Sequence, residues 1–256
     1  MQIQLLRHAT LLLSLNDQQI LVDPMLGPAG SMEAIQNAPN PRRIPLVDLP
    51  LERTALGTLL NQVDLVLVTH THRDHWDSAA VHLIPKSIPV VCQPQDERRI
   101  LEEGFSQVWP VADSFEWQGI HFSRTDGKHG EGEIGEKMAP VSGYFLQAEA
   151  EKSLYLAGDT IWCGEVESVL EQKRPEITVV NAGAAQFLTG GPITMTAEDV
   201  FRVCKAVPEG RVIAVHMEAV NHCLLTRGEL RARIEDQGLA ERVFIPEDGE
   251  QMEFNK

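Results

Sequence analysis

The segment that most constrains the fold is the apolar run at residues 63–68, Val-Asp-Leu-Val-Leu-Val, which a polar cluster follows directly. A run this short and this apolar is typical of a β-strand that is covered on both faces. Strands of that kind occur in layered α/β folds, in which helices cover the outer faces of a sheet. The helical spacing of apolar residues at 51–62, just before it, agrees with this arrangement.

Strand and helix patterns on either side of this run indicate two sheets. Residues 2–6, 10–15 and 18–22 predict an antiparallel meander. Strand-like runs fill the middle of the chain at 88–92, 105–108, 119–124, 141–148 and 153–157. An alternation follows, with helices at 161–173, 197–206 and 226–236 and strands at 177–181, 211–216 and 242–245. Both halves run from antiparallel strands into helix-linked strands, so we expect two packed sheets with helices outside.

Residues 24–50 differ from the rest in composition. They hold six of the fifteen prolines, together with Gly27, Gly30 and several asparagines, and this breaks both helix and strand periodicity. Long loops inside compact domains are uncommon and often functional, so the segment predicts a lid or a pocket wall. A plain surface excursion is the alternative.

The polar cluster after the buried strand is Thr69-His70-Thr71-His72-Arg73-Asp74-His75. Residues two apart on an extended backbone point the same way, so His70 and His72 can hold one metal ion. The turn that follows lets Asp74 and His75 reach a second ion. The spacing therefore predicts a site for two metals.

Composition limits the partners of such a site. The chain has 256 residues, with 43% hydrophobic and 23% charged residues, which is ordinary globular composition. Lys and Arg number 22 against 37 Asp and Glu, a net charge of −15 that disfavours nucleic acid and anionic membranes as partners. The four cysteines form no CxxC pair, and no apolar run is long enough to span a bilayer. We expect a cytoplasmic protein.

The cluster is similar to the His-X-His-X-Asp-His signature of the metallo-β-lactamase superfamily. The resemblance covers nearly the whole chain, because the meander, an Asp at an early strand end (Asp23), a strand ending in Gly-Asp (Asp159) and a last His at a strand end (His216) follow in order. It implies a four-layer αβ/βα sandwich of two mixed sheets, formed by residues 1–256 as one domain. It also implies one metal held by His70, His72 and His129, a second held by Asp74, His75 and His216, and Asp159 as the bridging carboxylate.

The residues themselves bear on these assignments. Asp159 ends a strand after Gly158, where α/β folds collect ligands, although it could instead cap the helix expected at residue 161. His216 also ends an apolar strand, and a histidine satisfied in the core is its alternative reading. His121 and His129 compete for the remaining position. We choose His129, which lies in a Gly-rich turn, because His121 alternates within a strand-like run.

Four side chains are candidates for further roles. Asp23 could accept a hydrogen bond from a ligating histidine, or it could simply form a turn. His8 precedes a strand and could reach the site, or it could be an ordinary buried residue. His222 follows the last ligand and could serve as general acid or bind substrate. Asp74 could orient a metal-bound hydroxide as well as bind metal.

A two-metal site of this kind predicts a hydrolase that attacks with a metal-bound hydroxide. Three histidines and a carboxylate suit Zn²⁺, which we expect first, and also Mn or Fe. Ile20 to Pro24, the Pro-rich loop and Gly158-Asp159-Thr160 resemble the lactonase-like branch of the superfamily, with ascorbate-phosphate lactonase and the phospholipase D that acts on N-acyl-phosphatidylethanolamines. The acidic chain lacks a hydrophobic docking extension, which speaks against a lipid substrate.

We therefore expect hydrolysis of a small soluble ester or lactone, with an anionic substrate and a possible homo-oligomer. A phosphodiesterase with the same metals is an alternative and would need basic residues near the pocket. The candidates are Arg42, Arg43, Arg73 and Lys128. A metal-loaded protein without catalysis is the third hypothesis.

Overall fold

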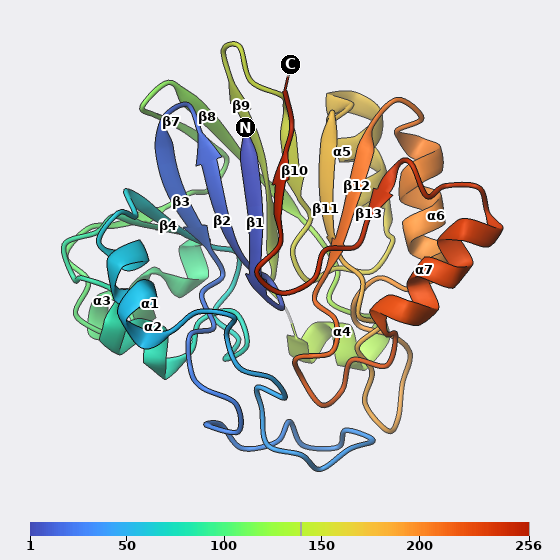
Figure 1. Ribbon diagram of the computed structural model, residues 1–256, viewed down its shortest axis with the longest axis horizontal. Helices are drawn as coiled ribbons and strands as arrows, with labels where there is room; N and C mark the ends of the chain where they lie inside the picture. The colour runs from blue at the N-terminus through green and yellow to red at the C-terminus, as the bar shows by residue number, and fades with distance from the viewer. Residues whose placement is uncertain (139, 256) are drawn as a thin grey trace.

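The computed structural model describes residues 1–138 and 140–255, and in them two seven-stranded sheets lie face to face (Figure 1). The first sheet has the order β14 (Gln251–Glu253), β1 (Gln2–Arg7), β2 (Thr10–Leu15), β3 (Gln18–Val22), β4 (Leu65–Val68), β5 (Val90–Cys92), β6 (Val108–Pro110). The second has the order β13 (Val243–Phe244), β12 (Arg211–Val215), β11 (Ile177–Asn181), β10 (Leu154–Leu156), β9 (Ser142–Ala148), β8 (Ile120–Asp126), β7 (Ser114–Trp117).

Both sheets are mixed, as the sequence predicts. The pairs from β14 to β3 are antiparallel and those from β3 to β6 parallel, while β7 to β10 pair antiparallel and β10 to β13 parallel. Parallel neighbours need crossover connections, and helices supply them. The helices are α1 (Arg53–Leu60), α2 (Ser78–Leu83), α3 (Glu97–Glu102), α4 (Gly132–Met138), α5 (Gly164–Lys173), α6 (Ala197–Ala206) and α7 (Arg227–Asp236), with a 3₁₀ turn η1 (Pro94–Asp96) before α3.

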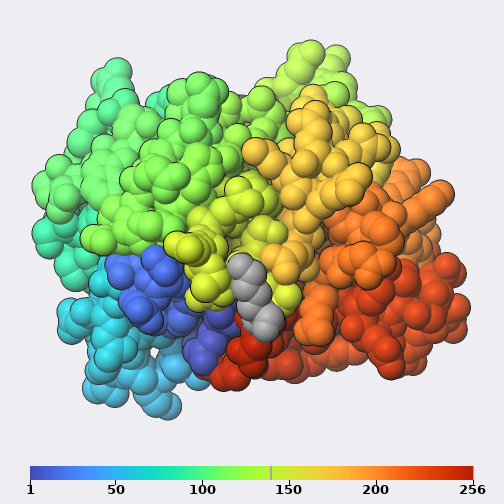
Figure 2. All heavy atoms as spheres, turned by 90° about the horizontal axis from the view of Figure 1, so that it is seen from above, coloured from blue at the N-terminus to red at the C-terminus, as the bar shows by residue number. Residues whose placement is uncertain are grey.

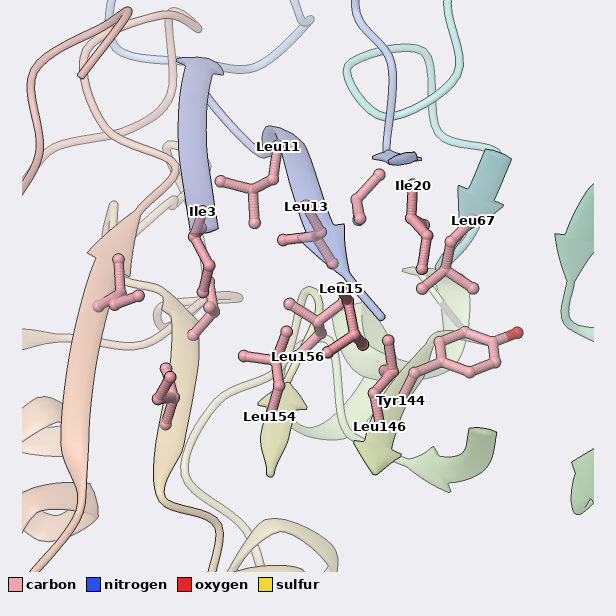
Figure 3. Packing of buried hydrophobic residues seen from close by; sticks show 14 of the residues in the cluster. Ile3, Leu11, Leu13, Leu15, Ile20, Leu67, Tyr144, Leu146, Leu154 and Leu156 are labelled. Carbon is pink, nitrogen blue, oxygen red and sulfur yellow. The ribbon is translucent and has the colours of Figure 1, made fainter. Parts of the chain in front are cut away.

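Three clusters of apolar side chains hold the four layers together, one between each pair of neighbouring layers. One cluster fills the space between the sheets, where Leu13 and Leu67 of the first sheet face Leu146 and Leu156 of the second (Figure 3). A second cluster joins the first sheet to α1, α2 and α3, and a third joins the second sheet to α5, α6 and α7. The two halves of the chain therefore lie side by side, blue to green on one side and yellow to red on the other (Figure 2). This is the four-layer αβ/βα sandwich that the sequence predicts.

Several predicted boundaries need correction. The helix expected from residue 161 begins at Gly164, because Ile161 N–H donates to the Lys128 carbonyl at 2.8 Å and keeps this stretch extended. The strand expected at 105–108 is Val108–Pro110, since Phe105 is buried among the helices that cover the first sheet. Helices α2, α3 and α4 were not predicted; with six or seven residues each, they are too short to show a clear period.

The loop of residues 24–50 lies at the end of the molecule opposite the two termini (Figure 1). A bridge between Met32 and Ile44 closes it on itself. The carboxyl ends of β3, β4, β10 and β12, which carry most of the candidate ligands, all reach this end. No helix among the described residues has the length and apolar character to cross a lipid bilayer.

Candidate metal centre

The histidine cluster forms a tight turn at the carboxyl end of β4. The His72 carbonyl accepts from His75 N–H at 2.9 Å and from Trp76 N–H at 2.8 Å, which folds the chain back after the strand. His70 and His72 point to the same place, with His70 Nε2 2.9 Å from His72 Nδ1. The expected geometry of the motif is therefore present.

A first group of donors comes from both sheets. One ring nitrogen from each of His70, His72 and His129 lies within 4.8 Å of the other two. His129 Nδ1–H donates to the Ile193 carbonyl at 2.7 Å, so its Nε2 lone pair faces the group. Three imidazole nitrogens with one tautomer held by a backbone carbonyl are a common arrangement for Zn²⁺.

A second group contains His8, Asp74, His75 and His216, whose ligand atoms also lie within 4.8 Å of one another. His75 Nε2 lies 3.2 Å from His216 Nε2. Asp74 Oδ2 lies 3.7 Å from the first of these nitrogens and 3.6 Å from the second. Tetrahedral Zn–N bonds of about 2.05 Å separate two ligand nitrogens by about 3.3 Å, so these spacings fit a bound divalent ion.

Asp159 lies between the two groups. Its Oδ2 is 3.2 Å from His75 Nε2 and 3.4 Å from His129 Nε2, and its Oδ1 is 3.2 Å from His216 Nε2. Asn181, at the end of β11, donates its amide to Oδ1 at 2.6 Å. Asp159 does not cap α5, whose N-cap is Cys163. One carboxylate that reaches histidines of both groups can bridge two ions.

Asp23 holds His75 from behind. Its Oδ2 accepts from His75 Nδ1–H at 2.9 Å and from the Thr69 hydroxyl at 2.7 Å, and its Oδ1 accepts from Thr69 N–H at 2.7 Å. Asp23 is buried and stands at the end of β3 with a φ of 43°. This contact leaves His75 Nε2 free to face the centre.

His8 enters the centre more deeply than its sequence position indicates. Its Nε2 lies 3.2 Å from Asp74 Oδ2, and its ring centroid lies 3.6 Å from that of His216. The His8 carbonyl accepts from His216 N–H at 2.9 Å, which brings the end of β1 against the end of β12. The residue has a φ of 62° and is fully buried. Burial lowers the pKa of His8 to about 3, so its ring is neutral.

Charge in the centre follows from burial and from the close pairs. Burial alone would raise the pKa of Asp159, but His216, His75 and His129 hold it well below its usual value. Burial opposes the charged form of His75, yet Asp159, Asp74 and Asp23 raise its pKa to about 10. Burial lowers the pKa of His70, His72 and His129. The ionised carboxylates and the neutral imidazoles of His70, His72 and His129 are ligands that divalent cations bind well. The carboxylates raise the pKa of His216 as well as that of His75, so a cation bound by these two side chains would displace their protons.

A cavity of about 250 Å³ opens onto these donors. Besides ligand candidates, its lining includes Ile35 of the long loop, Met138 of α4, Phe187, Arg73 and His222. The ring centroid of His222 lies 5.6 Å from that of Phe187, with the two rings tilted by 37°, and burial lowers the pKa of His222 to about 4. The loop thus does supply a pocket wall.

Several other residues considered in the sequence analysis lie outside the centre. His121 Nδ1 bonds its cross-strand neighbour Glu116 at 2.6 Å, outside the centre, which agrees with the choice of His129. Lys128 pairs with Glu165 and Arg43 with Glu33, and among the four basic candidates Arg73 alone is in the cavity lining.

Two residues of the site, Asn181 and Phe187, were not predicted from the sequence. The first could have been found by the strand-end rule that found Asp159; the second carries no local signal.

Comparisons with known proteins agree with this geometry. The family model of the β-lactamase superfamily domain matches residues 18–217. The UPF0173 protein YddR of Bacillus subtilis is 37% identical over 99% of this chain and 100% of its own length. A UPF0173 metal-dependent hydrolase of Thermoplasma acidophilum is 27% identical over 60% of this chain and 65% of its own.

Two solved structures are similar over the full length. The isothiocyanate hydrolase from Delia radicum gut bacteria is 36% identical, with a TM-score of 0.94 and complete coverage of both chains. A possible metal-dependent hydrolase from Veillonella parvula is 35% identical, with a TM-score of 0.94 and 98% coverage of each chain. The chain therefore belongs to the metallo-β-lactamase superfamily, and within it to the UPF0173 family of metal-dependent hydrolases.

Proposed function

We propose that the protein hydrolyses small isothiocyanates, R–N=C=S, to the amine R–NH₂ and carbonyl sulfide. The observation that carries this proposal is the small cavity over the His/Asp centre in a chain 36% identical, end to end, to an isothiocyanate hydrolase. The central carbon of an isothiocyanate is a compact electrophile, and the apolar side chains of Ile35 and Phe187 suit a short hydrocarbon substituent.

The centre is proposed to hold two divalent ions, with Zn²⁺ as the first expectation and Mn or Fe as alternatives. His70, His72 and His129 would hold one, Asp74, His75 and His216 the other, and Asp159 would bridge them. Bound there, the ions would lower the pKa of water toward neutrality and polarise the electrophile.

The side chains supply orientation and proton transfer. Asp74 accepts a hydrogen bond from the attacking water, and this bond directs a lone pair of the water oxygen at the central carbon of the substrate. His8 Nε2–H donates to the Asp74 carboxylate and holds it in place. Since burial lowers the pKa of His222 to about 4, its ring is neutral near pH 7 and has one N–H donor and one acceptor nitrogen. His222 then relays both protons of the water to the nitrogen, the first as the water oxygen bonds to the central carbon and the second as the C–N bond breaks and releases R–NH₂ and carbonyl sulfide.

Hydrolysis of a carboxylic ester or lactone is the second candidate. Water would attack the carbonyl carbon of such a substrate as it would the central carbon of an isothiocyanate. The two groups of candidate metal ligands on either side of Asp159 suit either reaction. A phosphodiester fits less well, because Arg73 is the one basic candidate in the cavity lining, Lys128 and Arg43 are paired elsewhere, and the cavity is small for two substituents.

A substrate panel tests the proposal. Protein purified without a metal-affinity tag and analysed for metal is assayed with benzyl isothiocyanate, a simple lactone and bis(p-nitrophenyl) phosphate, beside the Asp159→Asn variant. We expect the isothiocyanate to be consumed with one amine formed per molecule and the variant to be inactive. Turnover of the lactone alone would replace the first candidate by the second. Turnover of none, with two metals bound, would refute both.

A further inference from the structure

The wall of the cavity over the centre includes a positively charged side chain, Arg73, that has no role in the proposed metal binding or proton transfer. Arg73 stands between His72 and Asp74 in the histidine cluster, and its half-buried side chain lines the cavity. Neither residue beside it in the sequence can neutralise it, because His72 is a candidate ligand and the Asp74 carboxylate contacts His8 and His216.

Arg73 makes no side-chain hydrogen bond or ion pair with any residue that the structure describes. Four other arginines also lack such a partner among the described residues, but all of them are exposed: Arg42, Arg53, Arg174 and Arg211. Every other arginine that is buried or half-buried makes at least one side-chain hydrogen bond; Arg242, for example, bonds the Val207 carbonyl, and Arg227 bonds Glu218 and Asp248. Arg73 therefore differs from the other arginines in being both half-buried and without a side-chain partner among the described residues, in a chain with 37 acidic and 22 basic residues.

A guanidinium that is half-buried and unpaired at a pocket wall favours an anionic ligand. Its planar fork of N–H donors matches the two oxygens of a carboxylate or sulfonate. The net charge of −15 repels anions from the surface in general, so a local cation is needed for one to enter. The other walls, Ile35 and Phe187, are apolar and suit a short alkyl or aryl spacer.

We propose that Arg73 is a specificity-determining residue, which binds an anionic oxygen group carried by the substrate at the end remote from the reacting carbon. The preferred substrate is then a short chain or ring with an electrophilic carbon at one end and a carboxylate or related anion at the other. This inference rests on the proposed function only for the identity of the electrophile.

Kinetics with a matched substrate pair test it. The pair is an ω-isothiocyanato carboxylate and the primary amide of the same chain length, which has the same shape without the charge. Wild type should have the lower KM for the carboxylate, and Arg73→Gln should raise that KM about tenfold while leaving the amide nearly unchanged. Arg73→Lys keeps the charge and should recover part of the preference.

Arg98→Gln is the matched control. It removes one positive charge from an exposed site on α3 and should leave the preference intact. Metal content measured on every variant shows whether the neighbouring ligands still bind. A carboxylate preference that survives Arg73→Gln at full metal content would overturn the inference.

A binding measurement separates this inference from the proposed function. Calorimetry of butanesulfonate with metal-loaded protein needs no turnover, and sulfonates bind metals weakly. Wild type and Arg98→Gln should bind it, and Arg73→Gln should bind about tenfold more weakly. If no isothiocyanate is hydrolysed but this difference is found, the anion site stands and the electrophile is another. Equal binding in all three proteins would refute the role of Arg73.

Discussion

Asp159 depends on the residue before it for its position. Gly158 has a φ of 70°, and a Cβ there would lie 2.5 Å from the Ser142 carbonyl oxygen, so only glycine lets the backbone turn against β9. The turn carries the Asp159 carboxylate between His75, His129 and His216. The position of this carboxylate between the two groups of histidines is therefore a property of the Gly-Asp pair and not of the acid alone.

Replacing Asp159 by Asn keeps the shape of the side chain and removes its charge. We expect bound metal to fall below two equivalents and kcat/KM to fall by about 100-fold or more, since residues behind the ligands already contribute about 10- to 100-fold. Elemental analysis and steady-state kinetics measure both. Asp236→Asn, at the exposed end of α7, is the control and should match wild type. Full metal occupancy in the Asp159 variant would contradict the bridging role.

His222 is predicted to act on the substrate and not on the metals. His222→Gln should lower kcat by about 100-fold or more, as expected for a lost proton relay, with two metals still bound. Because the pKa of His222 is lowered to about 4, wild-type kcat should show no loss from its protonation between pH 6 and 8. His121→Gln, on the surface of β8, is the control. A variant that loses metal instead would make His222 a ligand.

At the scale of elements, one side chain joins the long loop to the segment after β12. The buried Asn221 donates its amide to the carbonyls of Ile35 at 3.0 Å and Asn40 at 2.6 Å, and its oxygen accepts from Ile35 N–H at 3.0 Å. Leu46 N–H also donates to the Ala219 carbonyl at 2.7 Å. These bonds hold Ile35 in the wall of the cavity. Asn221, which makes three of them, directly precedes His222 in the chain.

Asn221→Ala removes three of these hydrogen bonds and leaves backbone groups of the loop unsatisfied, at a cost of about 1–3 kcal/mol. We expect the loop to open more often, so trypsin should cleave after the exposed Arg42 and Arg43 faster than in wild type, and KM should rise while metal content stays constant. Gln36→Ala changes an exposed side chain of the same loop and is the control. Unchanged cleavage would show that the backbone contacts suffice.

The sequence predicted elements well where local and global signals agreed. Helix α6 matches its predicted bounds, because apolar periodicity and the Thr196–Asp199 capping box act together. The cluster at 70–75 was recognisable because its geometry is local. The place of His8 was not predictable in this way. It depends on β1 ending beside β12, a contact between residues more than 200 positions apart that no local pattern encodes.

At the scale of the molecule, the centre joins the two sheets. His70, His72, Asp74 and His75 follow β4 of the first sheet, whereas Asp159 and His216 follow β10 and β12 of the second. The same two sheets share the apolar cluster between them (Figure 3). Metal binding and core packing therefore stabilise one interface, and we expect residues 1–256 to unfold as a single domain.

Metal removal should then destabilise the whole molecule and not the site alone. Free metal at about 1,000 times its Kd adds about 4 kcal/mol to the free energy of unfolding. For a chain of this size that corresponds to roughly 10 °C in Tm. Scanning calorimetry with and without a chelator should show one transition in each case, lower without metal and restored by Zn²⁺. Asp159→Asn, which should bind less metal, should have a lower Tm than wild type, and the chelator should lower that Tm by less. Two transitions, with the chelator shifting only one, would show that the sheets unfold separately and that the centre stabilises just one of them.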